Sequence, residues 1–297
     1  MQIKGKVAII TGSGQGLGRA FAVRLLEHGA RVCLSDYNVE TGSNTLKELS
    51  ARFGEDKVHF IKCDVTKEEE LKSLYDGCET HFKSQVDIFC NNAGINHIPG
   101  WKKCMDIDIM AVICGTELAV DRMDIRKGGK GGLIVNTASL AGIGIGMSRE
   151  SASYFIAKHG VVSLTRTYGQ AKVVKDTGVK VQCICPAFTD TGILTDLEPD
   201  QKKLINKKFG IMTPEFVADA FIHLIKDGES GAAICIMKDA PPFYYEDFSR
   251  EWVTFLVVVG KILQKLFGIK VLTARHQLGF ALFTFLVLQF LIYLFLL

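Results

Sequence analysis

Short apolar runs alternate with amphipathic segments along the chain up to about residue 240. The runs are continuously apolar, as expected of strands that are buried on both faces of a parallel sheet. The segments between them have apolar positions at helical spacing. This order predicts an α/β fold, a doubly wound Rossmann-type parallel sheet in a single domain. The predicted strands are 6–11, 31–36, 58–65, 86–94, 131–139, 179–188 and 231–238, and the clearest helices are 18–29, 41–54 and 68–82.

The pattern changes towards the C-terminal end, after a domain predicted at 1–248. The segment 249–277 is apolar but interrupted by cations such as Lys261 and Lys265, which predicts an amphipathic, interfacial or membrane-dipping segment. Residues 278–297, LGFALFTFLVLQFLIYLFLL, carry no charge. At about 1.5 Å per helical residue they match a bilayer core of about 30 Å and predict a transmembrane tail anchor. A hydrophobic dimer contact or a cover for a substrate pocket is the alternative for both segments.

Charge and cysteine content narrow the classes of function. The chain has 35 basic and 32 acidic residues, a formal net charge of +3, and no basic stripe interleaved with aromatic residues. Nucleic acid is therefore not expected as a partner. The nine cysteines form no C-x-x-C pair and have no histidines at zinc spacing. We therefore expect reduced core thiols and no metal site. The apolar run in MQIKGKVAII is too short for a signal peptide, so the catalytic body is expected in the cytosol.

A glycine-rich turn follows the first predicted strand. TGSGQGLGRA brings Gly12, Gly16 and Gly18 before the first helix, where the backbone can approach a pyrophosphate at the positive helix end. Asp36 ends the second strand, where a carboxylate accepts bonds from ribose hydroxyls and repels a 2′-phosphate, which favours NAD over NADP. Asp64, at the end of the third strand, could meet the adenine amino group. The alternative for the glycine turn is a tight turn that packs against the sheet. The alternative for Asp36 is a solvated turn residue, and that for Asp64 is a helix N-cap.

Two reactive side chains lie four positions apart further along the chain. Tyr154 and Lys158 share one face of a predicted helix, so the ammonium can lie beside the phenol. A unit charge at about 4 Å in a dielectric of about 20 contributes roughly 4 kcal/mol, which would lower the Tyr154 pKa from about 10 towards 7. We therefore predict Tyr154 as the general base that removes a hydroxyl proton, and Ser139 as the residue that holds the same substrate oxygen.

Together these motifs resemble the short-chain dehydrogenase/reductase family. The resemblance rests on the spacing T-G-x-x-x-G-x-G, the NNAG run at 91–94 and the set Ser139, Tyr154 and Lys158, and it covers roughly residues 1–240. Within the family, the runs SLAG, KHGVV and ICPAF are most similar to the branch of NAD-dependent 15-hydroxyprostaglandin dehydrogenases. The resemblance implies that the serine, tyrosine and lysine are catalytic, and it implies a homodimer.

The resemblance also implies roles for further cofactor residues. Asn91, Ala93 and Gly94 would steady the central strand beside the cofactor, and Thr191 would contact the nicotinamide carboxamide. The expected cofactor-binding residues are Gly12, Gln15, Gly16, Leu17, Gly18, Asp36, Cys63, Asp64, Val65, Asn91, Ala93, Gly94, Tyr154, Lys158, Pro186 and Thr191.

Three positions depart from the pattern of the family. Asp108 stands where the family usually has an asparagine that positions the water chain of the lysine. We hypothesise that its charge alters the pH dependence of the proton relay, and we count Asp108 among the catalytic residues. The alternative is an aspartate that accepts helix N–H or water bonds without affecting the rate. Ala187 replaces a glycine after Pro186, and Ser151 replaces a glutamine of the prostaglandin branch, which leaves the substrate open.

These features predict an NAD-dependent oxidoreductase that oxidises a secondary alcohol of a lipophilic substrate to a ketone. A hydroxy fatty acid or prostaglandin-like substrate is expected first, and a hydroxysteroid or retinol is the alternative. A catalytically weak, nucleotide-binding membrane scaffold is the alternative from another class. The tail would anchor a cytosolic catalytic domain in a membrane, the endoplasmic reticulum in preference to the mitochondrial outer membrane. Confinement to that surface would concentrate a substrate dissolved in lipid.

Overall fold

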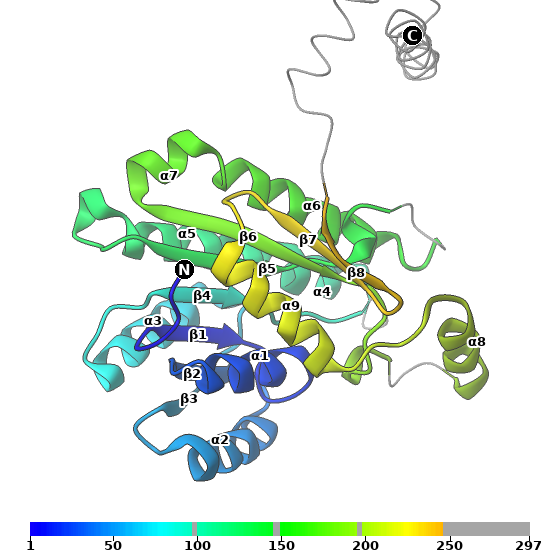
Figure 1. The fold of residues 1–297 in the computed structure, drawn as a ribbon, viewed down its shortest axis with the longest axis horizontal. Helices are drawn as coiled ribbons and strands as arrows, with labels where there is room; N and C mark the ends of the chain where they lie inside the picture. Colours follow the sequence, from blue (N-terminus) through cyan, green and yellow to red (C-terminus); the bar gives the residue numbers. More distant parts are fainter. Residues whose placement is uncertain (97–99, 145–148, 195–197, 246–297) are drawn as a thin grey trace, which may run out of the picture. The chain divides into compact units, whose positions relative to one another are not determined.

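The computed structural model describes residues 1–96, 100–144, 149–194 and 198–245. Its strands are β1 (Val7–Thr11), β2 (Arg31–Asp36), β3 (Val58–Lys62), β4 (Ile88–Asn91), β5 (Gly132–Thr137), β6 (Val179–Pro186), β7 (Ala233–Met237) and β8 (Ala240–Tyr244). They form one sheet in the order β3-β2-β1-β4-β5-β6-β7-β8 (Figure 1). Strands β1 to β7 are parallel, and β8 runs antiparallel to β7. The strand order reverses between β1 and β4, which is the switch point of a doubly wound sheet.

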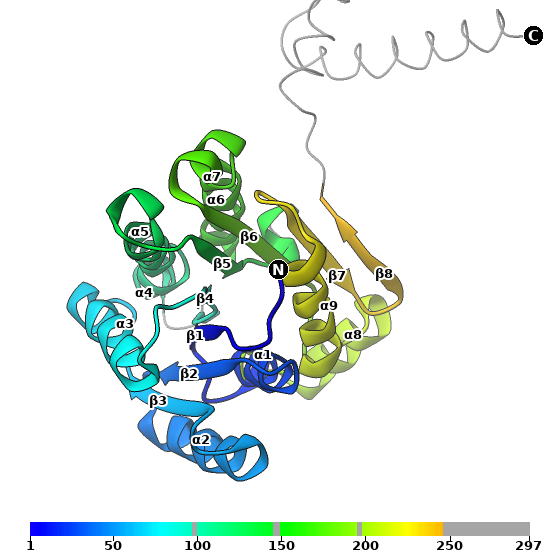
Figure 2. The ribbon, with the colours of Figure 1, turned by 60° about the vertical axis from the view of Figure 1, so that its left-hand side comes forward.

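Helices cover both faces of this sheet. They are α1 (Gly16–Glu27), α2 (Val39–Phe53), α3 (Glu68–Phe82), α4 (Trp101–Met105), α5 (Ala111–Met123), α6 (Ala152–Tyr168), α7 (Ala171–Thr177), α8 (Pro199–Phe209) and α9 (Pro214–Asp227). Helices α1, α2 and α9 pack on one face, and α3, α5 and α6 pack on the other (Figure 2). On the first face, Phe21 of α1 and Phe221 of α9 stack with their ring centroids 4.1 Å apart. The predicted doubly wound α/β sheet is confirmed.

The strands are buried because their apolar runs face helices on both sides. Every residue of β1 and of β4 is buried, as is every residue of β5 after Gly132. Continuous burial of this kind explains why the sequence shows unbroken apolar runs rather than alternation. The central strands thus form a rigid platform, and their carboxyl ends carry the residues of the candidate site.

A local irregularity lies between α4 and α5. The five residues Asp106–Met110 form a π-helical turn, η1, which continues α4 and leads directly into α5. Turns of this kind are rare and are often found at functional sites. Asp108 lies in this turn and is fully buried.

The edge strand β8 is absent from the strands that the sequence predicts. Its sequence APPFY contains Pro241 and Pro242, which lack backbone N–H groups and therefore do not read as a strand. In the structure it pairs with β7 through Ile234 opposite Tyr244, with a register irregularity near the prolines. Proline is tolerated here because β8 lies at the edge of the sheet.

The predicted interfacial segment 249–277 and tail anchor 278–297 lie outside the described residues, as does the predicted domain end at 248. Residues Met1–Tyr245 form one compact unit. Within the ranges that the structure describes, no helix is both long and apolar enough to cross a membrane. The anchor therefore stays a prediction.

Candidate active site

A cleft of about 1860 Å³ opens at the carboxyl ends of the parallel strands. The loops after β1, β2, β3 and β4 supply one half of its lining, which contains most of the predicted cofactor residues. The other half is lined by the 3₁₀ turns η3 (Leu140–Gly142) and η4 (Gly192–Leu194), by α6 and by α8. Ligands of doubly wound sheets bind at this edge, beside the switch point.

The glycine turn brings the backbone of the chain close to the cleft. Gly12 has a φ of 62°, and a Cβ there would lie 2.7 Å from the Ala93 Cα. A Cβ on Gly18 would lie 2.3 Å from the Gly12 carbonyl oxygen, so both positions require glycine. Within the described structure the N-cap of α1, Gln15, makes no side-chain capping bond, and the first turn of α1 has no acidic residue. Its free N–H groups fit the pyrophosphate of a dinucleotide.

Asp36 is held at the end of β2 by backbone donors. Its Oδ2 accepts the Gly14 N–H at 2.8 Å, and its Oδ1 accepts the Asn38 N–H at 2.9 Å. Carboxylate oxygens have further lone pairs, so both can still accept ribose hydroxyls in the cleft that Asp36 lines. Lys62, opposite Asp36 in the β2–β3 register, is paired with Glu70 at 2.8 Å. The site thus fits NAD better than a cofactor with a 2′-phosphate.

The end of β3 contributes three consecutive residues, Cys63, Asp64 and Val65, to the cleft lining. The Asp64 Oδ1 accepts the backbone N–H of Thr66 at 3.0 Å and its hydroxyl at 2.7 Å. Burial opposes ionisation, but these bonds hold the pKa of Asp64 below the ordinary carboxyl value. Lys67, not Asp64, is the N-cap of α3, so the alternative of a helix cap is wrong.

A buried amide network fixes the central strands below the cleft. The Asn91 Nδ2 donates to the Asn136 Oδ1 at 2.9 Å and to the Thr116 hydroxyl at 3.2 Å. Asn136 in turn donates to the Thr165 hydroxyl at 3.1 Å. The network joins β4, β5, α5 and α6 and leaves Asn91 behind the cleft wall rather than in it. Asn91 therefore stabilises the central strands below the cleft.

Asn92 and Thr137 complete the floor of the cleft, and sequence reasoning missed both. The Asn92 Nδ2 donates to the carbonyl oxygens of Thr11 and Gly12 at 3.0 Å each. Its Oδ1 accepts the hydroxyl of Thr137 at 3.2 Å. These bonds join the glycine turn to the end of β5. The available signal was the second asparagine of the NNAG run.

Lys158 lies at the floor of the cleft between two acceptors. Its Nζ donates to the Thr137 carbonyl at 3.1 Å and lies 3.1 Å from the Asp108 Oδ2. Burial disfavours the charge of Lys158, but Asp108 and then Tyr154 raise the pKa of its ammonium above the ordinary lysine value. Burial raises the pKa of Asp108, and Lys158 opposes that rise. We treat the two as an ion pair, because each charge is the main support of the other.

Tyr154 and Ser139 lie beside this pair and line the cleft. The Lys158 Nζ is 5.5 Å from the centroid of the Tyr154 ring. The Ser139 hydroxyl accepts the Ala141 N–H at 3.1 Å and donates to the Pro186 carbonyl at 3.4 Å. Ser139, Tyr154 and Lys158 are thus brought together as predicted from the motif.

The predicted direction of the Tyr154 pKa is wrong for this structure. Burial raises the Tyr154 pKa above 10, the ordinary tyrosine value, although Lys158 and, to a smaller extent, Ser139 lower it. Asp108 adds to the rise. The expected lowering counted the lysine charge but not the burial of the phenol, whereas the opposing effect of Asp108 agrees with the hypothesis made for that residue.

The remaining predicted cofactor residues follow β6. Pro186 and Thr191 line the cleft, and the Thr191 hydroxyl donates to the Thr189 carbonyl at 3.3 Å. A Cβ on Gly16 would lie 3.4 Å from the Thr191 side chain, so the glycine turn and this loop lie close together in the lining of the cleft. Of the predicted site residues, only Gly18, Asn91 and Asp108 lie behind the lining instead of in it.

Comparison with known sequences agrees with this site. The family described as short chain dehydrogenase matches residues 6–202. The 15-hydroxyprostaglandin dehydrogenases [NAD(+)] of Mus musculus and Homo sapiens are each 36% identical over 259 residues, covering 84% of this chain and 95% and 96% of those proteins. The 3beta-hydroxysteroid dehydrogenase 2 of Eggerthella lenta is 33% identical over 241 residues, covering 76% of this chain and 89% of that protein.

Solved structures show the same fold. A short chain dehydrogenase/reductase from Burkholderia phymatum in complex with NAD matches with a TM-score of 0.69 and 26% identity, over 79% of this chain and 90% of that one. Levodione reductase matches with a TM-score of 0.68 and 28% identity, over 79% of this chain and 96% of that one. The prediction of an NAD-dependent oxidoreductase is confirmed, and the chain belongs to the short-chain dehydrogenase/reductase family.

Proposed function

We propose that the chain oxidises a secondary alcohol on a lipophilic, anionic amphiphile, a hydroxy fatty acid or a prostaglandin-like molecule, to the ketone with NAD. The observation that carries the proposal is the meeting of Ser139, Tyr154 and Lys158 in a cleft whose far wall is apolar. The names of the mouse and human relatives support this substrate class.

The roles of the side chains follow from their positions. Ser139 holds the substrate oxygen, and Tyr154 in its phenolate form removes the hydroxyl proton. Lys158 stabilises the phenolate through its charge, because the two side chains lie on one helical face. When bound, NAD supplies the acceptor for the hydride that leaves the carbinol carbon.

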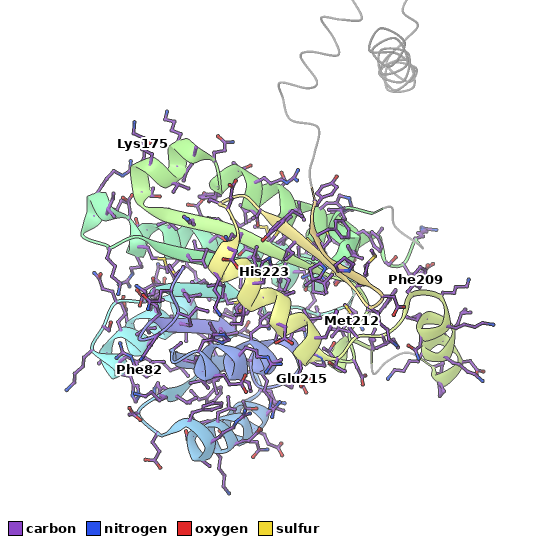
Figure 3. All side chains as sticks on the ribbon, viewed as in Figure 1. Phe82, Lys175, Phe209, Met212, Glu215 and His223 are labelled. Atoms are coloured by element: carbon purple, nitrogen blue, oxygen red, sulfur yellow. The ribbon has the colours of Figure 1, made fainter. Side chains whose placement is uncertain are left out.

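Helix α8 forms the far wall of the substrate half. Gln201, Leu204, Ile205 and Lys208 follow the i, i+3, i+4, i+7 pattern of one helical face, and all four line the cleft. Phe209 continues this wall at the end of α8 (Figure 3). Leu204 is 52% exposed and Phe209 is 51% exposed. An apolar ligand that covers these side chains would remove them from water.

Lys208 is the one lysine of α8 that lines the cleft. Across the part of the chain that the structure describes, Lys208 makes no ion pair or hydrogen bond with another side chain. A carboxylate at the end of an apolar substrate would supply the missing partner. The neighbouring Lys207 carries the same charge but does not line the cleft.

The test compares a hydroxy fatty acid or prostaglandin with its methyl ester in an assay of NADH formation. Lys208→Gln should lower kcat/KM for the acid about fivefold, the effect of one partly exposed charge pair, and leave the ester unchanged. Lys207→Gln is the matched control and should change neither. Equal losses with acid and ester would exclude the carboxylate contact, and absence of turnover with either would contradict the substrate class.

A hydroxysteroid is the second candidate, because the relative from Eggerthella lenta is named for that activity; retinol stays the other alternative. Turnover of neutral steroids or retinol in preference to hydroxy acids would favour this group. The scaffold alternative predicts that Tyr154→Phe keeps the biological effect of the protein while NADH formation is lost. An enzyme loses both.

We also propose that residues 278–297 anchor the protein in the endoplasmic reticulum with the catalytic domain in the cytosol. The support is their uncharged apolar sequence, preceded by a segment with interspersed cations. A chain cut after Asp247 should leave the membrane fraction and keep NADH formation. If the full chain is not found in membranes, the anchor is excluded; if it is found with mitochondria, the choice of membrane is wrong.

A homodimer is the expected assembly. Met110 and Ile156 are 57% and 61% exposed, and a subunit contact would cover them. Light scattering on the soluble form should give twice the monomer mass. Met110→Lys together with Ile156→Lys should shift it to the monomer.

A further inference from the structure

Asp108 is a buried carboxylate directly behind the catalytic lysine. It is 0% exposed, and its Oδ1 accepts the Ile95 N–H at 2.8 Å. Its Oδ2 lies 3.1 Å from the Nζ of Lys158, which is 3% exposed. The backbone of Gly94 packs against both, since a Cβ there would lie 3.4 Å from the Lys158 Nζ and 3.5 Å from the Asp108 Oδ2. The two charges therefore face each other directly.

This contact matters because Tyr154 depends on the charge of Lys158. An ammonium with no counter-charge lowers the energy of a nearby phenolate, whereas an ammonium paired with a carboxylate has little net charge. The titratable groups that act on Tyr154 are Lys158 on its own helix, Asp108 in η1 and the buried thiol of Cys104 in α4. Cys104 carries no charge that could replace the effect of Asp108, because burial raises its pKa.

We propose that Asp108 neutralises Lys158 and so keeps Tyr154 in the phenol form at neutral pH, which moves the oxidation of the alcohol to higher pH. This inference rests on the proposed oxidoreductase function and adds its pH dependence. Asp108 is here a positioning residue, since it acts through Lys158 and does not line the cleft.

The two directions place opposite demands on Tyr154. Reduction needs the phenol: its proton goes to the carbonyl oxygen while the carbonyl carbon receives the hydride of NADH, and water then reprotonates the phenolate. Oxidation needs the phenolate, which takes the hydroxyl proton while the carbinol carbon loses a hydride to NAD. Oxidation therefore rises with pH up to the Tyr154 pKa, and reduction falls above it. Burial and Asp108 both raise that pKa against the opposing effect of Lys158, which agrees with the inference.

The first measurement is a titration that needs no substrate. The ultraviolet absorbance of tyrosinate is followed against pH in the full chain and in Tyr154→Phe, and the difference isolates Tyr154. Tyr154 should ionise above the ordinary tyrosine value of 10.0 in the unmodified protein. In Asp108→Asn, Tyr154 should ionise about one pH unit lower or more. The reference for this variant is the double variant Asp108→Asn with Tyr154→Phe.

Asp106→Asn is the matched control. Asp106 belongs to the same π-helical turn but is exposed to solvent, so the same change of charge should move the Tyr154 titration much less. With a substrate that turns over, Asp108→Asn should shift the pH profile of oxidation to lower pH by the amount seen in the titration. A merely structural role of Asp108 would lower the rate at every pH without this shift.

Three results would overturn the inference. They are an unchanged Tyr154 titration in Asp108→Asn, an equal shift in Asp106→Asn, and a Tyr154 of the unmodified protein that ionises below 10.0. The last result needs no Asp108 variant, so the inference stays open to refutation even if Asp108→Asn does not fold. Lack of turnover with every substrate would instead refute the proposed function and leave the titration to be judged on its own.

Discussion

The two halves of the cleft are built in different ways. In the cofactor half, glycines with fixed backbone geometry and hydrogen bonds such as those of Asn92 hold each group in position. In the substrate half, α8 has no fully buried residue, and Leu204 and Phe209 are about half exposed. The side chains of the cofactor half are held in position without a ligand, whereas the substrate half exposes apolar surface that a ligand would cover.

This difference separates the demands on the two regions. Residues of the cofactor half also hold the sheet together, so a substitution there affects folding and binding at once. Residues of the substrate half contribute little to the core, so they can vary and change the choice of substrate without unfolding the domain. Paired substitutions of one residue type, at a packed position and at an open one, can test this contrast.

The largest contrast is expected between two phenylalanines. Phe221 is fully buried and stacks on Phe21 of α1, so Phe221→Ala should lower the free energy of unfolding by about 3–5 kcal/mol. Phe209→Ala should change it by less than about 1 kcal/mol, because the side chain is already half exposed, and should raise the KM for lipophilic substrates. Urea denaturation and steady-state kinetics give the two values. Similar losses of stability would show that α8 belongs to the core.

A smaller contrast is expected between two glycines with positive φ. Gly5 and Gly12 have φ values of 79° and 62°, but a Cβ meets nothing within 4 Å at Gly5 and lies 2.7 Å from the Ala93 Cα at Gly12. Gly5→Ala should cost about 1 kcal/mol from backbone strain alone. Gly12→Ala should cost more and weaken NAD binding, which calorimetric titration and urea denaturation measure. Equal losses would mean that the turn has room for a side chain.

The smallest effect concerns pH and lies away from the cleft. His59 of β3 stacks on His81 of α3 at 3.9 Å, and burial, followed by repulsion from His81, lowers the pKa of His59 below 6.5. The unfolded chain therefore binds the proton more readily than the folded one, so stability should rise with pH through this range. The free energy of unfolding at about pH 5 and about pH 8 measures the rise, and His59→Phe should reduce it. If the stability of His59→Phe rises with pH as much as that of the unmodified protein, other groups cause the rise.

Local patterns made much of the cleft predictable from the sequence. The spacing of glycines in one turn, a carboxylate at the end of β2, and a tyrosine and lysine on one helical face are each set by a few neighbouring residues. The structure brings Asp36, Ser139, Tyr154 and Lys158 to one cleft as that reasoning expected.

Features that depend on distant contacts could not be predicted in the same way. Asp108 was expected near Lys158 only through the family resemblance, because the π-helical turn in which it lies has no sequence pattern of its own. The raised pKa of Tyr154 comes mainly from burial, which the spacing of residues does not reveal. The role of α8 was missed because its lysine-rich sequence does not show which face turns to the cleft.

The two prolines of β8 limit how molecules of this protein can associate. In a regular strand, neighbouring residues direct their N–H groups to opposite sides, so Pro241 and Pro242 take a donor from each side. The outer edge of β8 thus offers an interrupted ladder to any strand from a second chain. A continuous sheet across two subunits, or a fibril that grows from this edge, is disfavoured even though Phe243 and Tyr244 are exposed there. Crowding of many copies on one surface would then carry little risk of aggregation through this edge.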